Sequence, residues 1–117
     1  MAIILDQHYQ ISAEGIEIVS VDCTPQLTDS KTLTGTPTIE IEEGDADNLT
    51  LGTPAINSAT FTDPNQTPDA TIAISHAVLF LATPAAAGTW RLRLTVNTND
   101  TTPAARKLVY DFYLTAT

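Results

Sequence analysis

The sequence predicts an all-β domain, a sandwich or small barrel of about six to eight short strands. Three observations predict this fold class. Two segments near the carboxyl end alternate apolar and polar residues with a period of two. Shorter runs rich in Thr, Val and Ile recur about every ten residues upstream, with Gly and Pro between them. The length of 117 residues and the apolar content of 43% fit a single domain with one modest core.

The two alternating segments, 89–96 and 108–115, are separated by turn-forming residues and predict a long antiparallel hairpin. Successive side chains of a strand point to opposite faces, so the apolar residues of each segment share one face. A helix would scatter the same residues around its circumference. We expect this inward set to supply half of the core. Its members are Trp90, Leu92, Leu94, Val96, Leu108, Tyr110, Phe112 and Leu114.

Six upstream runs repeat the pattern at shorter length and predict the remaining strands. They span 16–21, 38–42, 48–52, 55–61, 71–75 and 77–81. A turn cluster at 63–68 and the run Pro84-Ala-Ala-Ala-Gly88 are expected to interrupt the strands. Residues 16–117 are therefore expected to form the domain. For residues 1–15, an edge strand and a loose amino-terminal arm both stay open.

The composition excludes several classes of protein. A formal net charge of −9 provides no dense cationic face for nucleic acid and disfavours binding to an anionic membrane surface. Cys23 is the single cysteine, so no disulfide within the chain can stabilise the fold. No apolar run approaches the roughly 20 residues that span a bilayer. The amino terminus reaches Asp6 too early for the apolar core of a secretory signal.

The charge is unevenly distributed along the chain. Residues 1–70 contain twelve acids and one base, a net charge of −11, whereas residues 71–117 contain four bases and two acids, a net charge of +2. One interpretation is an ordinary solvated acidic surface. The other is a polar molecule whose cationic strand face, with Arg91 and Arg93, binds an acidic neighbour such as another copy of the chain.

The residues that carry enzyme chemistry are few. Nucleophilic catalysis needs a Ser, Thr or Cys beside a base that a third group orients. His76 lies between two apolar runs and is expected to be a hydrogen-bonded, partly buried residue, whereas His8 is expected to face solvent. Cys23 has no sequence neighbour that would lower its thiol pKa and is expected to be a small core side chain. The sequence therefore predicts no enzymatic activity and no cofactor.

The acidic segment 42–48 gathers the oxygen ligands that Ca²⁺ prefers, with Glu43, Asp45 and Asp47 as weak candidates. It does not match the EF-hand pattern, because Leu49 stands where a third Asp or Asn would follow Asp45 and Asp47. Zinc is disfavoured because the two His and the Cys lie far apart in the sequence. We expect a solvated loop here, and cation binding is the less favoured alternative.

Three segments have a pattern of strands that is similar to that of a known protein family. They are the leucine–threonine strand and its continuation at 48–61, the small-residue turn and Thr-rich strand within 77–98, and the final strand of alternating aromatics at 106–114. In these segments the chain resembles small Ig-like virion proteins of tailed bacteriophages, of the fibre–tail adaptor or head decoration type. The resemblance covers roughly residues 38–115. It implies an Ig-like antiparallel β-sandwich.

The resemblance also implies a non-enzymatic structural protein of the virion, made in the host bacterial cytoplasm. Its role would be that of a capsid decoration (cement) protein or a neck or fibre adaptor. The expected partners are other virion proteins, either major capsid or neck and tail proteins, and possibly further copies of itself. Candidate interface residues lie in the amino-terminal segment, which could add to a neighbour's sheet, and on the cationic strand face. They are Ile3, Ile4, Leu5, Tyr9, Arg91 and Arg93.

Two other classes remain open at this point. A carbohydrate- or receptor-binding module would share the sandwich and would stack sugar rings on exposed aromatic side chains. Tyr9 and Tyr113 are the aromatic residues that we expect to be exposed. A domain of a bacterial surface protein is the third class.

Overall fold

The computed structural model describes residues 3–27, 31–63, 70–100 and 106–117, and within them the side chains of 9–27, 31–62, 71–100 and 106–117. Most of the predicted turn cluster at 63–68 lies outside the described residues. The two short 3-10 helices are η1 (Thr24–Gln26) and η2 (Ala46–Asn48). The strands are β1 (Ile3–Ile11), β2 (Glu17–Asp22), β3 (Leu33–Glu43), β4 (Leu49–Leu51), β5 (Ala55–Ile56), β6 (Phe61–Asp63), β7 (Ala70–Ile72), β8 (Ala77–Pro84), β9 (Gly88–Thr98) and β10 (Lys107–Ala116).

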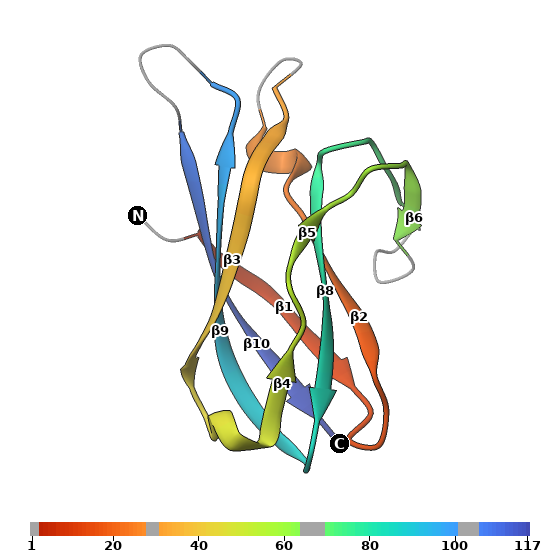
Figure 1. Ribbon diagram of the computed structural model, residues 1–117, viewed down its shortest axis with the longest axis vertical. Coiled ribbons are helices and arrows are strands. Elements are labelled where there is room, and N and C mark those ends of the chain that lie inside the picture. The colour runs from red at the N-terminus through yellow and green to blue at the C-terminus, as the bar shows by residue number, and fades with distance from the viewer. Residues whose placement is uncertain (1–2, 28–30, 64–69, 101–105) are drawn as a thin grey trace.

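Eight of the ten described strands form two sheets that pack face to face, and β6 and β7 form a separate two-stranded sheet (Figure 1). The first sheet has the order β1-β10-β9-β3, and the second has the order β2-β8-β4 with β5 also paired to β8. Immunoglobulin domains place strands B, E and D in one sheet and strands C, F and G in the other. The strands β2, β8 and β4 and the strands β3, β9 and β10 repeat that arrangement. The chain is an Ig-like β-sandwich, as the sequence predicts.

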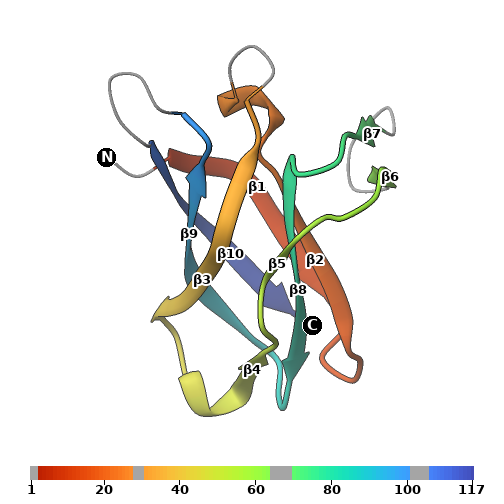
Figure 2. The ribbon, with the colours of Figure 1, turned by 45° about the horizontal axis from the view of Figure 1, so that its top comes forward.

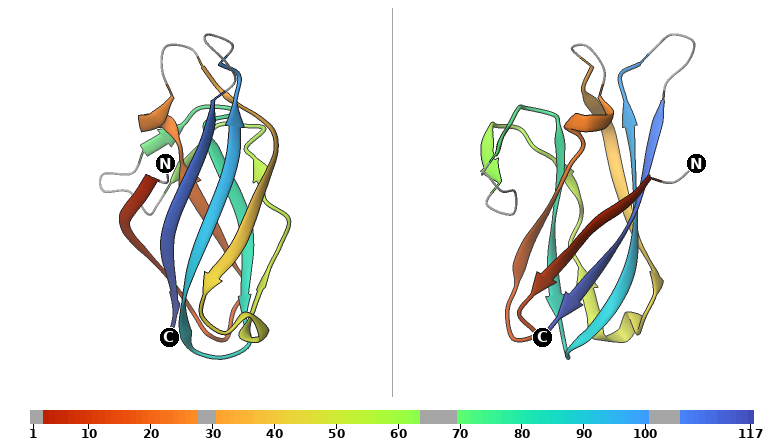
Figure 3. Two further views of the ribbon diagram at one scale, coloured as in Figure 1. Left: turned by 90° about the vertical axis from the view of Figure 1, so that its left-hand side faces the viewer. Right: turned by 180° about the vertical axis from the view of Figure 1, so that it is seen from behind.

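The edge strand β1 departs from a purely antiparallel sandwich. It runs parallel to β10, from Ile3 opposite Tyr110 to Ile11 opposite Ala116, with an irregularity between Ile4 and His8 (Figure 3). Residues 3–11 are thus an edge strand of the chain's own first sheet. Because this strand pairs with β10, residues 3–11 do not form a loose arm.

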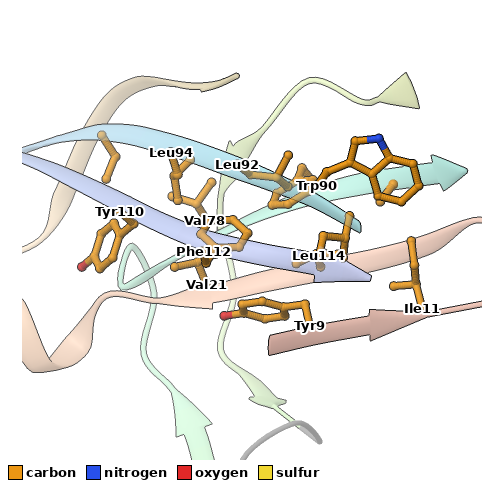
Figure 4. Close-up of a cluster of buried hydrophobic side chains, with 14 of the residues drawn as sticks. Tyr9, Ile11, Val21, Val78, Trp90, Leu92, Leu94, Tyr110, Phe112 and Leu114 are labelled. Carbon is orange, nitrogen blue, oxygen red and sulfur yellow. The ribbon is translucent and has the colours of Figure 1, made fainter. Parts of the chain in front are cut away.

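The core lies between the two sheets and is dominated by the β9–β10 hairpin (Figure 4). All eight side chains that the alternation assigns to the inner face are buried. Val19 and Val21 from β2 and Val78 and Phe80 from β8 pack in the same cluster. Phe112 links the layers, because its ring centroid lies 5.2 Å from that of Tyr9, edge to face, and 6.4 Å from that of Phe80.

Trp90 closes one end of the sandwich. Its indole Nε1 donates a hydrogen bond to the Asp45 carbonyl at 2.8 Å. Gly44 lies against the same ring, so a Cβ added there would meet Trp90 Cδ1 at 2.6 Å and the Thr89 carbonyl at 2.8 Å. Gly44 also has a φ of +104°, which side chains of L residues rarely adopt. A buried Trp and an adjacent Gly therefore fix the path of the acidic segment.

Three features of the upstream strands differ from the predictions. The run predicted at 71–75 is a strand only as far as Ile72, the end of β7, and residues 74–75 form a turn. The strand predicted at 38–42 begins at Leu33 and continues through Gly35-Thr-Pro37, where the register with β9 shifts between Thr34 and Thr38. A bulge on an edge strand accommodates a proline, which has no N–H to donate. The run predicted at 55–61 is divided between β5, which pairs with β8, and β6, which pairs with β7. The described residues therefore form ten strands instead of six to eight.

The β6–β7 hairpin lies beside the two packed sheets (Figure 2). The buried Asn57 links the segments on either side of this hairpin to the start of β8. Its Nδ2 donates to the carbonyls of Ala59 and Ala73, and its Oδ1 accepts the N–H groups of His76 and Ala77. Both polar atoms of the amide are therefore satisfied. The side chain adds to two backbone hydrogen bonds at the same place, from the Asn57 N–H to the Ala77 carbonyl and from the Ser75 N–H to the Asn57 carbonyl.

Replacing Gly44 by alanine tests the closure of the sandwich at Trp90. Gly44→Ala should destabilise the domain by about 1–3 kcal/mol, because the new Cβ collides with the indole in a backbone conformation that favours glycine. Urea unfolding followed by Trp90 fluorescence measures this change. Gly15→Ala is the matched control, since its added Cβ would meet its nearest neighbour at 3.8 Å. Equal free energies of unfolding for Gly44→Ala and the wild type would contradict this role of Gly44.

Candidate protein-docking surface

Three large apolar side chains are exposed next to one another on the outside of the second sheet. Ile16, Ile18 and Leu81 are 67%, 65% and 47% exposed. Ile18 of β2 lies directly opposite Leu81 of β8, and Ile16 stands two positions before Ile18, where the alternation of a strand returns to the same face. We call these three residues the apolar patch. Large apolar side chains that adjoin on a surface are typical of a binding site.

The sequence contains a signal for the apolar patch that the prediction missed. In β2, Val19 and Val21 occupy odd positions and are buried between the sheets, whereas Ile18, and Ile16 directly before the strand, occupy even positions and are exposed. The apolar alternation thus changes phase between Ile18 and Val19, so apolar residues point to both faces. A strand that is apolar on both faces is typical of one that is covered on both sides. Here the outer side of β2 at Ile18 is open.

The outer face of the first sheet is polar and electrostatically paired. Arg91 and Arg93 converge on the buried Asp111, with Arg91 Nη2 at 3.0 Å from Oδ2 and Arg93 Nε at 2.8 Å from Oδ1. The strand register places Asp111 opposite Arg93. Glu43 lies 3.4 Å from Arg91, and Glu42 lies 3.9 Å from Arg93. The chain thus supplies acidic partners for Arg91 and Arg93 itself, which weighs against the interpretation that these residues form a cationic face for an acidic neighbour.

This network shifts the pKa values of its members. Hydrogen bonds from Arg93 and then Arg91 lower the pKa of the Asp111 carboxyl, although burial opposes the shift. Hydrogen bonds to Asp111 raise the pKa of both guanidinium groups. The carboxylate of Asp111 thus stays ionised at neutral pH at a site that is only 5% exposed.

The remaining candidate interface residues lie at the amino-terminal strand. Tyr9 is 7% exposed and packs on Phe112, so its prediction as an exposed residue is wrong. The edge position of β1 does not expose Tyr9, because its side chain points into the core. The side chains of Ile3, Ile4 and Leu5 lie outside the described residues. Tyr113 is 40% exposed on the outer face of the first sheet, as expected.

The acidic segment 42–48 uses its carboxylates within the fold. Asp45 Oδ1 accepts the Asp47 N–H at 3.0 Å, and Asp45 Oδ2 accepts the Asn48 side-chain amide at 3.1 Å. Glu43 pairs with Arg91. Among the side chains that the structure describes, no three His, Cys, Asp or Glu residues form a group that could hold a metal ion. The carboxylates of Asp45 and Glu43 thus stabilise η2 and the sheet.

His76 and Cys23 lie close to each other in the chain's three-dimensional structure without forming a catalytic arrangement. His76 Nδ1 lies 3.2 Å from Thr24 Oγ1, and the described residues include no third group that orients the imidazole. Cys23 is fully buried next to Val21, and burial raises the pKa of its thiol to about 12. The side chain of His8 lies outside the described residues. Thr24 and His76 thus form an exposed hydroxyl–imidazole pair, and Cys23 is an un-ionised thiol in the core.

Comparison of the chain with protein-family models, with curated proteins and with solved structures gives no match. Within the described ranges, no helix is long and apolar enough to cross a membrane.

Asp111→Asn tests the ion-pair network on the first sheet. A carboxyl whose pKa is lower in the folded than in the unfolded state stabilises the fold above the unfolded pKa, and this contribution is lost as the pH falls through the folded pKa. Asp111→Asn should therefore lower the Tm by several degrees at pH 7, and the difference from the wild type should shrink below about pH 4, near the ordinary pKa of Asp. Calorimetry between pH 2 and 8 measures this, with Glu14→Gln as an exposed control. A difference in Tm that is independent of pH would contradict the assignment.

The thiol of Cys23 should be unreactive while the domain is folded. Thiolate is the attacking species, and a pKa near 12 leaves very little of it at pH 8. An aromatic disulfide reagent should therefore label the native chain at least about a hundredfold more slowly than the chain in denaturant. Rapid labelling of the native chain would contradict the buried position of Cys23.

Proposed function

We propose that the chain is a non-enzymatic structural protein of a tailed bacteriophage virion. It acts through protein–protein contacts as a capsid decoration (cement) protein or as a neck or fibre adaptor. Its partners are other virion proteins, and its place of action is the assembled particle.

The observation that carries the proposal is the apolar patch on an Ig-like sandwich. Single exposed apolar residues are ordinary on protein surfaces. Ile18 and Leu81, however, face each other across two paired strands, and Ile16 extends the same surface. A sandwich with its own complete core gains nothing for its own folding from these residues. Their exposure is accounted for if another protein covers them.

The strand rhythm of residues 38–115 adds independent support, because it resembles that of small Ig-like virion proteins. The paired outer face of the first sheet is consistent with this role, since its ion pairs within the chain leave little charge for recognition. The burial of Tyr9 removes one of the two aromatic residues on which a carbohydrate-binding role would depend.

Mass spectrometry of purified phage particles tests the proposal. Tailed particles are purified by density gradient from a culture that expresses the gene, and each protein is quantified relative to the major capsid protein. The chain should be present in a fixed, multiple copy number per particle. Particles from a deletion mutant should lack it and should take up the purified wild-type chain in the same copy number.

Two results would contradict the virion role. The first is a chain that is abundant in the lysate of the producing cells yet missing from the purified particles. The second is a copy number that varies between preparations and falls with further washing, which is the behaviour of a contaminant. A copy number of a few per particle would favour the neck or fibre role, whereas hundreds of copies would favour decoration.

A further inference from the structure

The apolar patch adjoins an open strand edge. The second sheet has the order β2-β8-β4, so β2 is a border strand (Figure 1). The Cys23 N–H donates to the His76 carbonyl at 2.8 Å, in the same antiparallel register that pairs Val21 with Val78 and Ile18 with Leu81. Since hydrogen-bonded pairs alternate along an antiparallel ladder, the backbone groups of Val19 and Val21 point toward β8. Those of Ile18 and Ser20 point away from it. Ser20 is only 7% exposed, so the open part of this edge lies at Ile18 and at Ile16, which directly precedes β2 and is 67% exposed.

The surroundings of this edge are acidic. Glu14 precedes β2, and Glu17 is its first residue. The Glu17 carboxylate accepts the Ser12 N–H at 3.1 Å, which holds it at the turn between β1 and β2. Among the described residues, no Lys or Arg lies within ion-pair distance of Glu14 or Glu17. The edge thus presents two carboxylates beside exposed isoleucines, a combination that is complementary to apolar residues flanked by cations.

A second copy of the chain cannot supply that complement. Lys31 and Arg106 pair with Asp100, and Arg91 and Arg93 pair with Asp111. These are four of the five basic residues in the sequence. The fifth, Lys107, lies at the start of β10 in the other sheet. Two copies with a net charge of −9 each would also repel one another if they met edge to edge.

We infer that β2 is the docking edge for a β-strand of a different protein, one with apolar side chains on one face and Lys or Arg on the other. The incoming strand pairs with the backbone of Ile16 and Ile18, at the exposed beginning of β2, and extends the second sheet. Its apolar face covers the apolar patch, and its cations lie near Glu14 and Glu17. Backbone pairing supplies affinity in this mode, and the alternating side chains supply specificity. This inference rests on the proposed function, because it names the surface through which the chain would attach to a virion protein.

The probe that tests the edge is a synthetic capped hexapeptide, Lys-Val-Lys-Val-Lys-Val. It is titrated into ¹⁵N-labelled full-length chain at low salt, with the acidic peptide Glu-Val-Glu-Val-Glu-Val as its counterpart. The basic peptide should give saturable shifts of the Ile16 and Ile18 amide signals, and the acidic peptide should give none. Added salt should weaken binding, because part of the attraction is between exposed charges.

Variants separate the parts of the surface. Ile18→Gln should weaken binding of the basic peptide at least about tenfold, since an exposed apolar side chain of this size contributes more than 1.4 kcal/mol when it is covered. Glu17→Gln, which can still accept the Ser12 N–H, should weaken binding a few-fold and reduce its salt dependence. Ile74→Gln is the matched control, because Ile74 is 52% exposed and lies outside the second sheet. All three changes are at surface positions, and unchanged spectra elsewhere in the domain verify folding.

Several outcomes would overturn the inference. They are equal shifts with both peptides, equal loss with Ile18→Gln and Ile74→Gln, or no saturable binding of the basic peptide. A wild-type dimer in sedimentation that Ile18→Gln converts to a monomer would assign the edge to a second copy instead. The particle experiment stays separate from these results. A chain found in particles that does not bind the peptide refutes the edge alone, whereas peptide binding by a chain that is missing from particles refutes the virion role alone.

Discussion

The packing of the inner face of β9 against the second sheet is the interaction on which the rest of this structure depends. β9 lies between β10 and β3, so both of its backbone edges are paired. Trp90, Leu92 and Leu94 are almost completely buried along its inner face. Because successive side chains must point to opposite faces, this arrangement forces Arg91 and Arg93 onto the outside. Core packing and surface electrostatics are therefore set by the same strand.

The two outer faces of the sandwich have different characters as a result. On the first sheet, the carboxylate of Asp111 from β10 forms ion pairs with the two arginines of β9, so these arginines have their acidic partner within the chain. On the second sheet, the outer positions of β2 and β8 include Ile18 and Leu81, and no comparable pairing is present among the described residues. The docking surface that we propose follows from this asymmetry. It needs neither a catalytic group nor a cofactor, which fits a structural role.

The sequence predicts the parts of the fold that depend on local alternation. The inner face of the β9–β10 hairpin could be assigned residue by residue, because a period of two specifies it directly. The parallel pairing of β1 with β10 could not be predicted, since it joins the two ends of the chain without a local signal. The burial of Tyr9 follows from that pairing and was missed for the same reason. The continuation of β3 through Pro37 was missed because a bulge on an edge strand tolerates what an interior strand would not.

The candidate site was predicted less well than the fold, for two physical reasons. The partner of Arg93 is decided by the register of the hairpin, which places Asp111 opposite it, and the sequence alone does not fix that register. The apolar patch depends on which face of β2 meets the core. The change of phase between Ile18 and Val19 shows in the sequence that β2 is apolar on both faces, but it does not show which set stays exposed.

Native-state hydrogen exchange, read amide by amide, tests the central claim most directly. If β9 is the fully paired centre of the fold and β2 is an open border, the amides of Leu92 and Leu94 should exchange only through global unfolding. In the same experiment the amide of Ile18 should exchange orders of magnitude faster, while those of Val19 and Val21 stay protected. Strong protection of Ile18, or fast exchange in β9, would contradict this description of the molecule.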